Sequence, residues 1–478
     1  MIKWGVAAGT HDGSIAVVKD NDILFASHTE RYSRKKNDPH LDSQLLRRAL
    51  RYGQPDVIYW YENPYKKALR KLWAGQPDKW MNPRDYLSNY GIYGDIKYGN
   101  HHKSHAAAGF ATSKFDSSAV LVIDAIGEFT TTSISLYSAD EGGKISGKTL
   151  RSRIYPQSLG LFYSAITDRV QLKPNEDEYI LMGMSAYGEP RHADEMRDML
   201  RANFNFHRGC ANFFPQADHF DLAASAQKVY EEEFIKLLNL TETLTKSKNL
   251  VLMGGCALNC LANRHVHKFF ENVWVMPNPG DAGSSIGAIA AGEMQMLNWE
   301  TPYIGEEIEG KYPVKEIMEE LLENNIVGVA NGKAEFGPRA LGNRSLFANP
   351  TGQEMKDLVN KIKQRQEFRP FAPVILQEDV HKHFYVEKGF ESPYMQYIVR
   401  AKDPKKYPAI VHKDGTSRVQ TVTREQHAGL YRLLKQWKKH TGIPMLLNTS
   451  LNIKGEPMVN SRKDADLFQK RYGVKVVS

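Results

Sequence analysis

The chain alternates short apolar runs with polar turns, which is the pattern of buried strands in an α/β protein. Near the N-terminus there are three apolar runs, at residues 4–8, 15–18 and 23–26, and polar turns separate them. A related order returns later, with an apolar run at 119–123 and a returning strand at 132–137. Two copies of strand, polar turn and returning strand predict a duplicated unit.

Two further apolar runs lead directly into turns rich in glycine and proline. The run at 250–253 enters Gly254 and Gly255, and the run at 273–276 enters the turn 277–281. Glycines let the backbone approach a ligand closely, and the start of a new helix favours a phosphate. The pattern therefore predicts ligand-binding turns at the ends of buried strands.

A fall in apolar content at 301–309 marks a domain boundary, because Glu306, Glu307 and Glu309 stand there. In a chain of 478 residues two domains are expected, since a single core stops growing at roughly 250 to 300 residues. We expect an α/β protein with domains at 1–304 and 305–478. The duplicated first domain has the layout of two ribonuclease-H-like halves, as in the actin and sugar-kinase superfamily.

Four residues from distant segments form a candidate metal site. His101 and His105 stand four apart, which places both imidazoles on one face of a helix. Asp124 ends an apolar run, and Asp281 stands at the entry to a helix rich in alanine and glycine. Two imidazoles and two carboxylates suit a borderline divalent ion such as Fe, Zn or Mn. The alternative is a pair of histidines whose hydrogen bonds are satisfied within the helix.

The charge of the chain favours anionic ligands. The net charge is +8 and the isoelectric point is about 9.0, which phosphorylated small molecules would satisfy as well as nucleic acid. Basic stretches with aromatic neighbours lie at 65–73 and 432–439. Both are consistent with amphipathic helices that expose a basic face, and with nucleic-acid contacts.

The cysteines and the apolar runs bear on the compartment. The chain has only three cysteines, Cys210, Cys256 and Cys260. A small, odd number of cysteines argues against a disulfide framework, so we expect core thiols and a reducing cytoplasm. For a phage-encoded chain this would be the host cytoplasm. The sequence contains no apolar run near the roughly 20 residues that span a bilayer. The N-terminus is read as a first strand rather than a signal peptide.

The second domain is dense in arginine, glycine and asparagine. Its basic and polar segments are 335–345, 361–365, 368–373, 414–418 and 447–452. A Walker A sequence is absent, so a nucleotide must be held differently. Converging arginines, a lysine and hydroxyls predict a cradle for a small phosphorylated compound, with a surface salt-bridge network as the alternative.

These segments, taken in order, resemble the O-carbamoyltransferase family of the nodulation, cephamycin and tobramycin carbamoyltransferases. The blocks that carry the resemblance are 10–13, 30–34, 101–107, 183–188, 254–259, 281–283, 335–345, 368–373, 414–420 and 447–457. The resemblance implies an N-terminal domain similar to the ATPase that attaches threonylcarbamoyl to tRNA adenosine. It also implies a YrdC-like C-terminal domain.

The resemblance further implies an activity and a set of roles. The C-terminal site would form carbamoyl-adenylate from carbamoyl phosphate and ATP with Mg²⁺, and the N-terminal site would pass the carbamoyl group to an acceptor hydroxyl. The implied metal ligands are His101, His105, Asp124 and Asp281, with Fe²⁺ preferred over Zn²⁺ or Mn²⁺. The implied catalytic residues are His11, Lys363 and Arg418. The implied substrate and nucleotide contacts are Gly254, Gly255, Asn259, Arg339, Arg344, Lys363, Arg369, Arg418, Asn448 and Ser450.

The acceptor and several alternatives stay open at this point. The short build and the basic charge motivate an acceptor in DNA, a hydroxymethylated pyrimidine such as 5-hydroxymethylcytosine. Ile180 stands where the family leads us to expect a lysine. The alternatives are a sugar or antibiotic hydroxyl, tRNA threonylcarbamoyl transfer, a carbohydrate kinase, and a serine hydrolase with its elbow at Gly283–Gly287. A homodimer is one assembly we consider.

Overall fold

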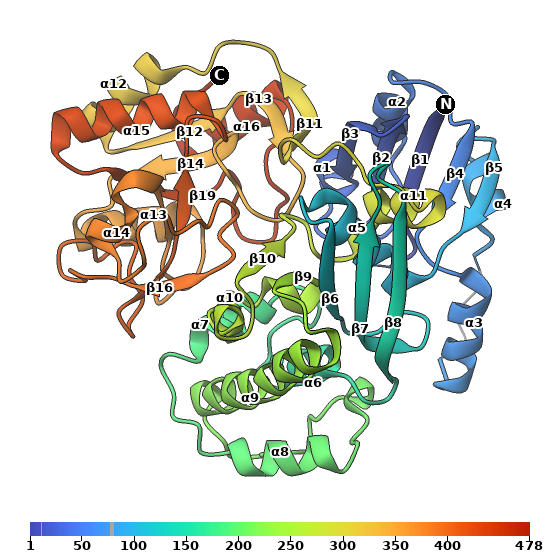
Figure 1. Cartoon of the computed structure of the whole chain (residues 1–478). Helices are drawn as coiled ribbons and strands as arrows, with labels where there is room; N and C mark the ends of the chain where they lie inside the picture. Colours follow the sequence, from blue (N-terminus) through green and yellow to red (C-terminus); the bar gives the residue numbers. More distant parts are fainter. Residues whose placement is uncertain (11, 77–80) are drawn as a thin grey trace. The chain divides into compact units, whose positions relative to one another are not determined.

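The computed structural model describes residues 1–10, 12–76 and 81–478, and these form two compact units (Figure 1). Unit 1 contains Met1–Thr29 and Asn37–Glu300, and unit 2 contains Glu30–Lys36 and Thr301–Ser478. The sequence led us to expect all of 1–304 in the first domain. Instead, the contacts group the short segment Glu30–Lys36, here called the strap, with unit 2. The local amino-acid composition does not indicate that this N-terminal segment packs with the second unit.

Unit 1 contains two five-stranded sheets with the same topology. In the first sheet β1 pairs antiparallel with β2 and parallel with β4, and in the second β6 pairs in the same way with β7 and β9. The first sheet has the order β3(Asp22–His28)-β2(Ser14–Lys19)-β1(Ile2–Ala7)-β4(Val57–Trp60)-β5(Asp95–Tyr98). The second has the order β8(Ile145–Ile154)-β7(Thr130–Ala139)-β6(Ser117–Ile123)-β9(Asn249–Met253)-β10(Asn272–Val275). The predicted duplication is therefore confirmed, with two ribonuclease-H-like halves.

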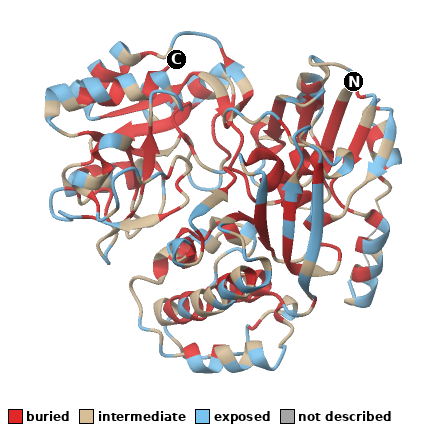
Figure 2. Ribbon diagram, viewed as in Figure 1, coloured by how far each residue is buried: buried red, intermediate tan, exposed pale blue. Residues whose placement is uncertain are grey.

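Two helices lie between these sheets and position the candidate metal ligands. Helix α11 (Ser284–Glu293) packs on β1, β2 and β4, helix α5 (His101–Thr112) packs on β6 and β9, and the two helices pack on each other. A side chain at Gly287 would collide with the Ser104 carbonyl oxygen, at 1.8 Å from an added Cβ, so glycine permits this close approach. Figure 2 shows β1 and β6 as largely buried.

The close packing of α11 also excludes one alternative. Ser285 is fully buried and donates its hydroxyl to the Ala282 carbonyl, 2.9 Å away. The nucleophile of a serine hydrolase must be exposed at a sharp strand-to-helix turn. The hydrolase interpretation of Gly283–Gly287 is therefore wrong.

The other helices of unit 1 cover the outer faces and form a helical subdomain. They are α2 (Ser43–Leu50), α3 (Pro64–Trp73), α4 (Pro83–Ser88), α6 (Leu159–Arg169), α7 (Glu178–Met184), α8 (Ala193–Arg201), α9 (His219–Thr245) and α10 (Cys260–Asn263). Ile180 lies in α7 and is 1% exposed, so this departure from the family pattern is a core residue. Within the described residues, all three cysteines are free thiols. The described helices include none that is long and apolar enough to cross a membrane.

Unit 2 is an α/β layer structure around a six-stranded mixed sheet. Its order is β18(Gln420–Val422)-β15(Ala372–Leu376)-β19(Met445–Ser450)-β14(Arg344–Ala348)-β12(Ile326–Ala330)-β20(Val476–Val477). Apolar residues of α12 (Val314–Asn324) and α15 (Ala428–Thr441) form one core, and those of α13 (Gln353–Ile362) and α16 (Arg462–Tyr472) contribute to another. Smaller elements are α1 (Glu30–Ser33), α14 (Val380–His383), β11 (Tyr303–Ile308), β13 (Gly332–Glu335), β16 (Ile398–Arg400) and β17 (Thr416–Arg418).

Candidate active site

The first turn of α5 is fixed by an acidic residue from another segment. The Glu128 carboxylate accepts hydrogen bonds from the backbone N–H groups of Asn63 and His101, at 2.8 and 3.2 Å, and from Asn100 Nδ2 at 2.7 Å. Asn100 in turn caps the helix by accepting from the Lys103 N–H. An anionic cap of this kind stabilises a helix N-terminus. It also sets the direction in which His101 projects.

The four predicted metal ligands converge in the interior of unit 1. One ligand atom from each of His101, His105, Asp124 and Asp281 lies within 4.8 Å of all the others. His101 Nε2 lies 3.0 Å from Asp124 Oδ2, and His105 Nε2 lies 3.1 Å from Asp281 Oδ1. All four side chains are buried. The spacing of the two histidines on one helix therefore does bring their rings together.

The outer oxygens of the two aspartates are held by other donors. Thr10 Oγ1 donates to Asp281 Oδ2 at 3.4 Å, and the Gly255 N–H donates to Asp124 Oδ1 at 3.1 Å. Gly254 has a φ of 90°, and an added Cβ would lie 2.2 Å from the Ile123 carbonyl oxygen. The glycine turn thus has a steric reason, since a side chain at Gly254 would push the Gly255 N–H away from Asp124.

A buried ion pair lies directly behind His101. Glu62 Oε2 is 3.6 Å from His101 Nδ1, and Glu62 Oε1 accepts from Lys67 Nζ at 2.5 Å. Lys67 also donates to the Gly9 carbonyl, 3.4 Å away. Carboxylates in this position orient ligating imidazoles in metal sites. Glu62, Lys67 and Glu128 could not be predicted from the sequence, because they lie in loops and on a helix without a recognisable spacing.

The carboxylates and imidazoles of the cluster shift one another's pKa values. Burial acts to lower the pKa of His101, but Asp281 and Asp124 outweigh it and raise that pKa well above its usual range. Burial acts to raise the pKa of Asp281, and the two imidazoles reverse this and hold it well below its usual range. The arrangement therefore favours two carboxylates facing positive charge.

The donor set fits a divalent metal ion. The Nε2 atoms of both histidines point at each other, 3.1 Å apart, and at two carboxylates. Two nitrogen and two oxygen donors with neutral imidazoles are the ligands that borderline ions such as Fe²⁺, Zn²⁺ and Mn²⁺ accept. His101, His105, Asp124 and Asp281 would hold such an ion, with Glu62 behind one of them.

Three further polar residues of the first domain have different surroundings. His102 turns away from the cluster, and its Nδ1 contacts the Ser133 hydroxyl at 2.9 Å. The amide of Asn259 exchanges hydrogen bonds with Gln227 at 3.1 and 3.2 Å and caps α10, so its side chain is engaged within the fold. His11 lies outside the described residues.

Lys363 is the centre of the polar groups in unit 2. It is 4% exposed, and its Nζ donates to the Ser450 carbonyl at 2.6 Å, to the Ser450 hydroxyl at 3.1 Å and to Asn452 Oδ1 at 2.6 Å. Burial and the charges of Arg365 and Arg369 lower the pKa of Lys363 well below its usual range. The structure thus brings Lys363, Arg369 and Ser450 together and adds Arg365 and Asn452, which were not predicted. Such clustered cations are suited to an anionic ligand.

Arg418 and Arg339 differ in how they are held. Arg418 ends β17, and its Nε is buried without a hydrogen-bond partner among the residues that the structure describes. An unsatisfied buried donor costs free energy, so it is a candidate ligand contact. Arg339 is half-buried in the loop between β13 and β14. Asn448 Nδ2 donates to the next carbonyl of that loop, Ala340, at 3.0 Å.

Arg344 requires a correction. It is fully buried, and all three guanidinium nitrogens donate to backbone carbonyls. The acceptors are those of Asn460, Asn331, Gly332, Asn343 and Glu306, at 2.8 to 3.2 Å. Its guanidinium stabilises the fold around β14, so we remove Arg344 from the substrate-binding set. A sequence pattern cannot separate an arginine that binds carbonyls from one that binds phosphate, since both stand in glycine-rich loops.

The two basic stretches also have different structures. In α15, Leu433, Leu434 and Trp437 are buried, so residues 432–439 form an ordinary amphipathic helix. In α3 the pattern is inverted, because Lys67 and Arg70 are buried while the apolar side chains are exposed. The exposed apolar residues are Tyr65, Leu69, Leu72 and Trp73. Two of the four basic residues in 65–73 therefore face the protein interior.

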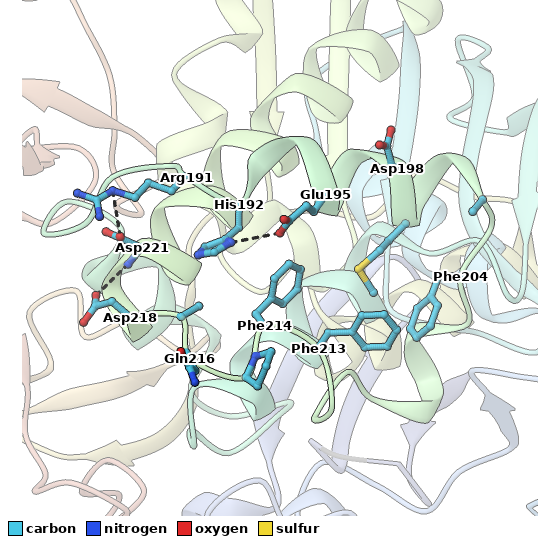
Figure 3. Close-up of a pocket in the computed structure, with 14 residues that line it drawn as sticks. Arg191, His192, Glu195, Asp198, Phe204, Phe213, Phe214, Gln216, Asp218 and Asp221 are labelled. Atoms are coloured by element: carbon cyan, nitrogen blue, oxygen red, sulfur yellow. Dashed lines mark hydrogen bonds and ion pairs between the residues drawn. The ribbon is translucent and has the colours of Figure 1, made fainter.

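A pocket of about 1160 Å³ lies elsewhere in unit 1, between α8, the loop that follows it and the start of α9 (Figure 3). Phe204, Phe213 and Phe214 line it together with several acidic side chains. Ion pairs already engage two of its carboxylates, Arg191 with Asp221 and His192 with Glu195. None of the lining residues belongs to the metal cluster, and we assign this pocket no part in the reaction.

Comparisons with known families and proteins cover both units. Residues 61–290 match the model of the carbamoyltransferase N-terminus, and residues 318–477 match that of the carbamoyltransferase C-terminus. An uncharacterized protein of Synechocystis is 33% identical, with 96% of this chain and 93% of that protein covered. Nodulation protein NolNO of Sinorhizobium fredii is 30% identical, with 95% of this chain and 76% of that protein covered.

A third relative has a chemically specific name. The 3'-hydroxymethylcephem-O-carbamoyltransferase of Amycolatopsis lactamdurans is 28% identical, over 97% of this chain and 95% of that protein. Among solved structures, HypF of T. kodakarensis aligns with 61% of this chain and 47% of its own at 14% identity and a TM-score of 0.36. That structural likeness is too low to inform the chemistry of the site.

Proposed function

Because the chain belongs to the carbamoyltransferase family, in which it is an O-carbamoyltransferase, we propose that its two units divide the reaction. Unit 2 forms carbamoyl-adenylate, and unit 1 transfers the carbamoyl group to an acceptor hydroxyl. The buried cluster of His101, His105, Asp124 and Asp281 is the observation that carries this proposal, because it supplies a charged centre for the transfer step.

The proposed reaction has a definite balance. Water cleaves the bond that joins the carbamoyl and phosphate groups of carbamoyl phosphate, which gives carbamate and inorganic phosphate. A carbamate oxygen attacks the α-phosphorus of ATP, and pyrophosphate leaves with its Mg²⁺. The acceptor hydroxyl oxygen then attacks the carbamoyl carbon, the hydroxyl proton passes to a base, and AMP leaves.

In unit 2, the proposed carbamoyl phosphate and ATP contacts are Lys363, Arg369, Arg418, Arg339 and Ser450. Two features support them, namely the buried Nε of Arg418 and the positive charge around Lys363. Forked guanidinium groups bind phosphate oxygens bidentately, and they offset the charge that develops during phosphoryl transfer. Asn448 supports the loop of Arg339 through the Ala340 carbonyl.

In unit 1, the four ligands would hold a divalent ion, for which we propose Fe²⁺, with Zn²⁺ and Mn²⁺ as alternatives. When bound, such an ion supplies Lewis-acid polarisation of a carbonyl oxygen. The N–H of Gly255 and the hydroxyl of Thr10 hold the aspartates in place. We propose that His11 takes the proton of the acceptor hydroxyl and that the glycine turn at Gly254 lies against the adenylate.

For the acceptor we propose the hydroxyl of a small molecule. The relative from Amycolatopsis carries such an acceptor in its name, a hydroxymethylcephem. Hydroxymethylated DNA was motivated by the basic charge, and the burial of Lys67 and Arg70 weakens that motive. 5-Hydroxymethylcytosine DNA is nevertheless the second acceptor to assay.

One assay tests the division of labour. The metal-loaded protein is incubated with ATP, with carbamoyl phosphate, and with both. Pyrophosphate that appears only with both substrates supports adenylation, and ADP as the nucleotide product would contradict it and favour a kinase. Mass spectrometry of sugar hydroxyls, hydroxymethyl compounds and hydroxymethylated DNA then identifies the acceptor by the added mass of one carbamoyl group.

A further inference from the structure

The strap, Glu30–Lys36, is the part of the N-terminal sequence that packs in unit 2. Arg34, near the end of the strap, anchors it to that unit through two backbone carbonyls. Arg34 donates from Nη1 to the Met458 carbonyl at 2.7 Å and from Nη2 to the Pro457 carbonyl at 2.9 Å. Arg34 also has a φ of 59°, a left-handed conformation that is strained for residues other than glycine. A strained backbone held by two guanidinium bonds indicates a specific position.

Arg31 is the residue of the strap that enters the interior of unit 2. It is 2% exposed, and its Nη2 donates to the Gly337 carbonyl at 3.0 Å. Gly337 stands two residues before Arg339, in the loop that joins β13 to β14. Burial lowers the pKa of Arg31, and the carboxylates of Glu30 and Glu335 oppose that fall. Arg31 is thus a buried cation that touches the start of the Arg339 loop.

The other end of this loop is held by Glu335. Its Oε1 accepts from the backbone N–H groups of Leu341, Asn343 and Arg344 at 2.8, 2.9 and 3.2 Å. Three N–H donors on one carboxylate oxygen make a rigid turn. The loop therefore has two anchors of opposite charge. Arg31 binds the loop before Arg339, at Gly337, and the Glu335 carboxylate binds it after Arg339, at residues 341–344.

We propose that Arg31 is a positioning residue for the carbamoyl phosphate site, which it serves by fixing the Arg339 loop from the N-terminal strap. This inference rests on the proposed function of unit 2. Arg31 lies in one of the segments that resemble the family, but the resemblance gave it no role at that site. Arg31 holds the Gly337 carbonyl, so that the backbone presents Arg339 to the phosphate of a small dianion.

This role predicts a specific kinetic signature. A hydrogen bond from a charged group contributes enough that its loss corresponds to roughly a ten- to hundredfold effect. Arg31→Met should therefore raise the KM for carbamoyl phosphate by about that factor in pyrophosphate release. The KM for ATP and the metal content of unit 1 should stay unchanged. Arg31→Lys keeps the charge without the planar fork, and it should restore part of the affinity.

The control is Lys35→Met, which removes a charge from the same strap at an exposed residue. It should behave as the unmodified protein. Thermal melting shows whether each variant is folded, and if Arg31→Met unfolds, Arg31→Lys alone decides. A KM for carbamoyl phosphate in Arg31→Lys that equals that of the unmodified protein then overturns the inference. Pyrophosphate release by the unmodified protein that does not depend on carbamoyl phosphate would overturn the proposed function itself.

Discussion

His101 Nε2 and His105 Nε2 lie 3.1 Å apart, and each also lies within 3.1 Å of an aspartate oxygen. Both rings are almost completely buried. A single proton between the two nitrogens would leave the inner carboxylate oxygens, Asp124 Oδ2 and Asp281 Oδ1, without a donor from either ring in a site of low polarity. A shared divalent cation satisfies all four groups at once, which is why we regard this pair as the core of the transfer site.

His105→Ala should lose the metal and carbamoyl transfer while unit 2 continues to form carbamoyl-adenylate. The reason is that the cluster lies wholly in unit 1, and removal of one of four ligands opens the site. Elemental analysis gives the metal content, mass spectrometry of the carbamoylated acceptor gives the transfer activity, and carbamoyl phosphate-dependent pyrophosphate release gives the adenylation activity. His102→Gln on the same helix is the control, since His102 contacts Ser133 and should retain the metal. An equal fall in both activities of His105→Ala would contradict the division of labour.

Arg418→Ala should have the reverse effect. Loss of a guanidinium that binds a transferring phosphate costs about 10²- to 10³-fold in kcat/KM, while the metal stays bound. The measurement is the rate of pyrophosphate release as a function of carbamoyl phosphate. Arg400→Ala is the matched control, because Arg400 is an exposed arginine at the other strand of the same two-stranded sheet. Adenylation that survives in Arg418→Ala would remove this residue from the site.

Glu62→Gln should weaken metal binding by roughly ten- to a hundredfold, as is usual for carboxylates behind a ligating imidazole. The variant keeps the shape of the side chain and removes the charge that faces His101 and Lys67. Metal affinity is measured by competition with a chelator on the folded protein. Glu293→Gln, which breaks the ion pair with Lys3 at 2.7 Å, is a control of the same chemistry away from the cluster. Equal metal affinity in both variants would show that Glu62 has no such role.

His427 should make unit 2 less stable in mild acid. Its Nδ1 accepts from the Leu430 N–H and caps α15, and its Nε2–H donates to Asn343 Oδ1 at 2.8 Å. Burial lowers the pKa of His427 from 6.5 to about 4. Between these values the unfolded chain binds a proton that the folded chain does not, so stability falls as the pH drops from 6.5 toward 4. The loss is at most about 3 kcal/mol.

The check for His427 is the free energy of unfolding of unit 2 at pH 7 and at pH 4.5, compared between the unmodified protein and His427→Gln. The variant has no imidazole to protonate, so the difference in stability between the two proteins should shrink at the lower pH. A constant difference would mean that His427 has the same pKa in the folded and the unfolded chain, so that burial does not disfavour its protonated form.

Much of the architecture follows from local sequence patterns. Apolar runs bounded by polar turns identified β1, β2, β6 and β9 and the duplication of unit 1, because burial of a strand is a local property. The spacing of His101 and His105 on a helix, and the positions of Asp124 and Asp281 after strands, were enough to predict that these four side chains form one cluster. Their convergence requires only that the two halves face each other, which the duplicated topology provides.

Other features depend on contacts between separate segments of the chain, and only the tertiary structure decided them. The strap belongs to unit 2, Glu62 lies behind His101, and Arg344 binds carbonyls rather than a ligand. The inverted α3 belongs here as well, since Lys67 binds the Glu62 carboxylate and Arg70 binds the Glu128 carbonyl instead of facing solvent. Residue types and periodicity report whether a position is buried in a regular element. They do not report which distant partner satisfies its charge, because that depends on how the whole chain is connected and packed.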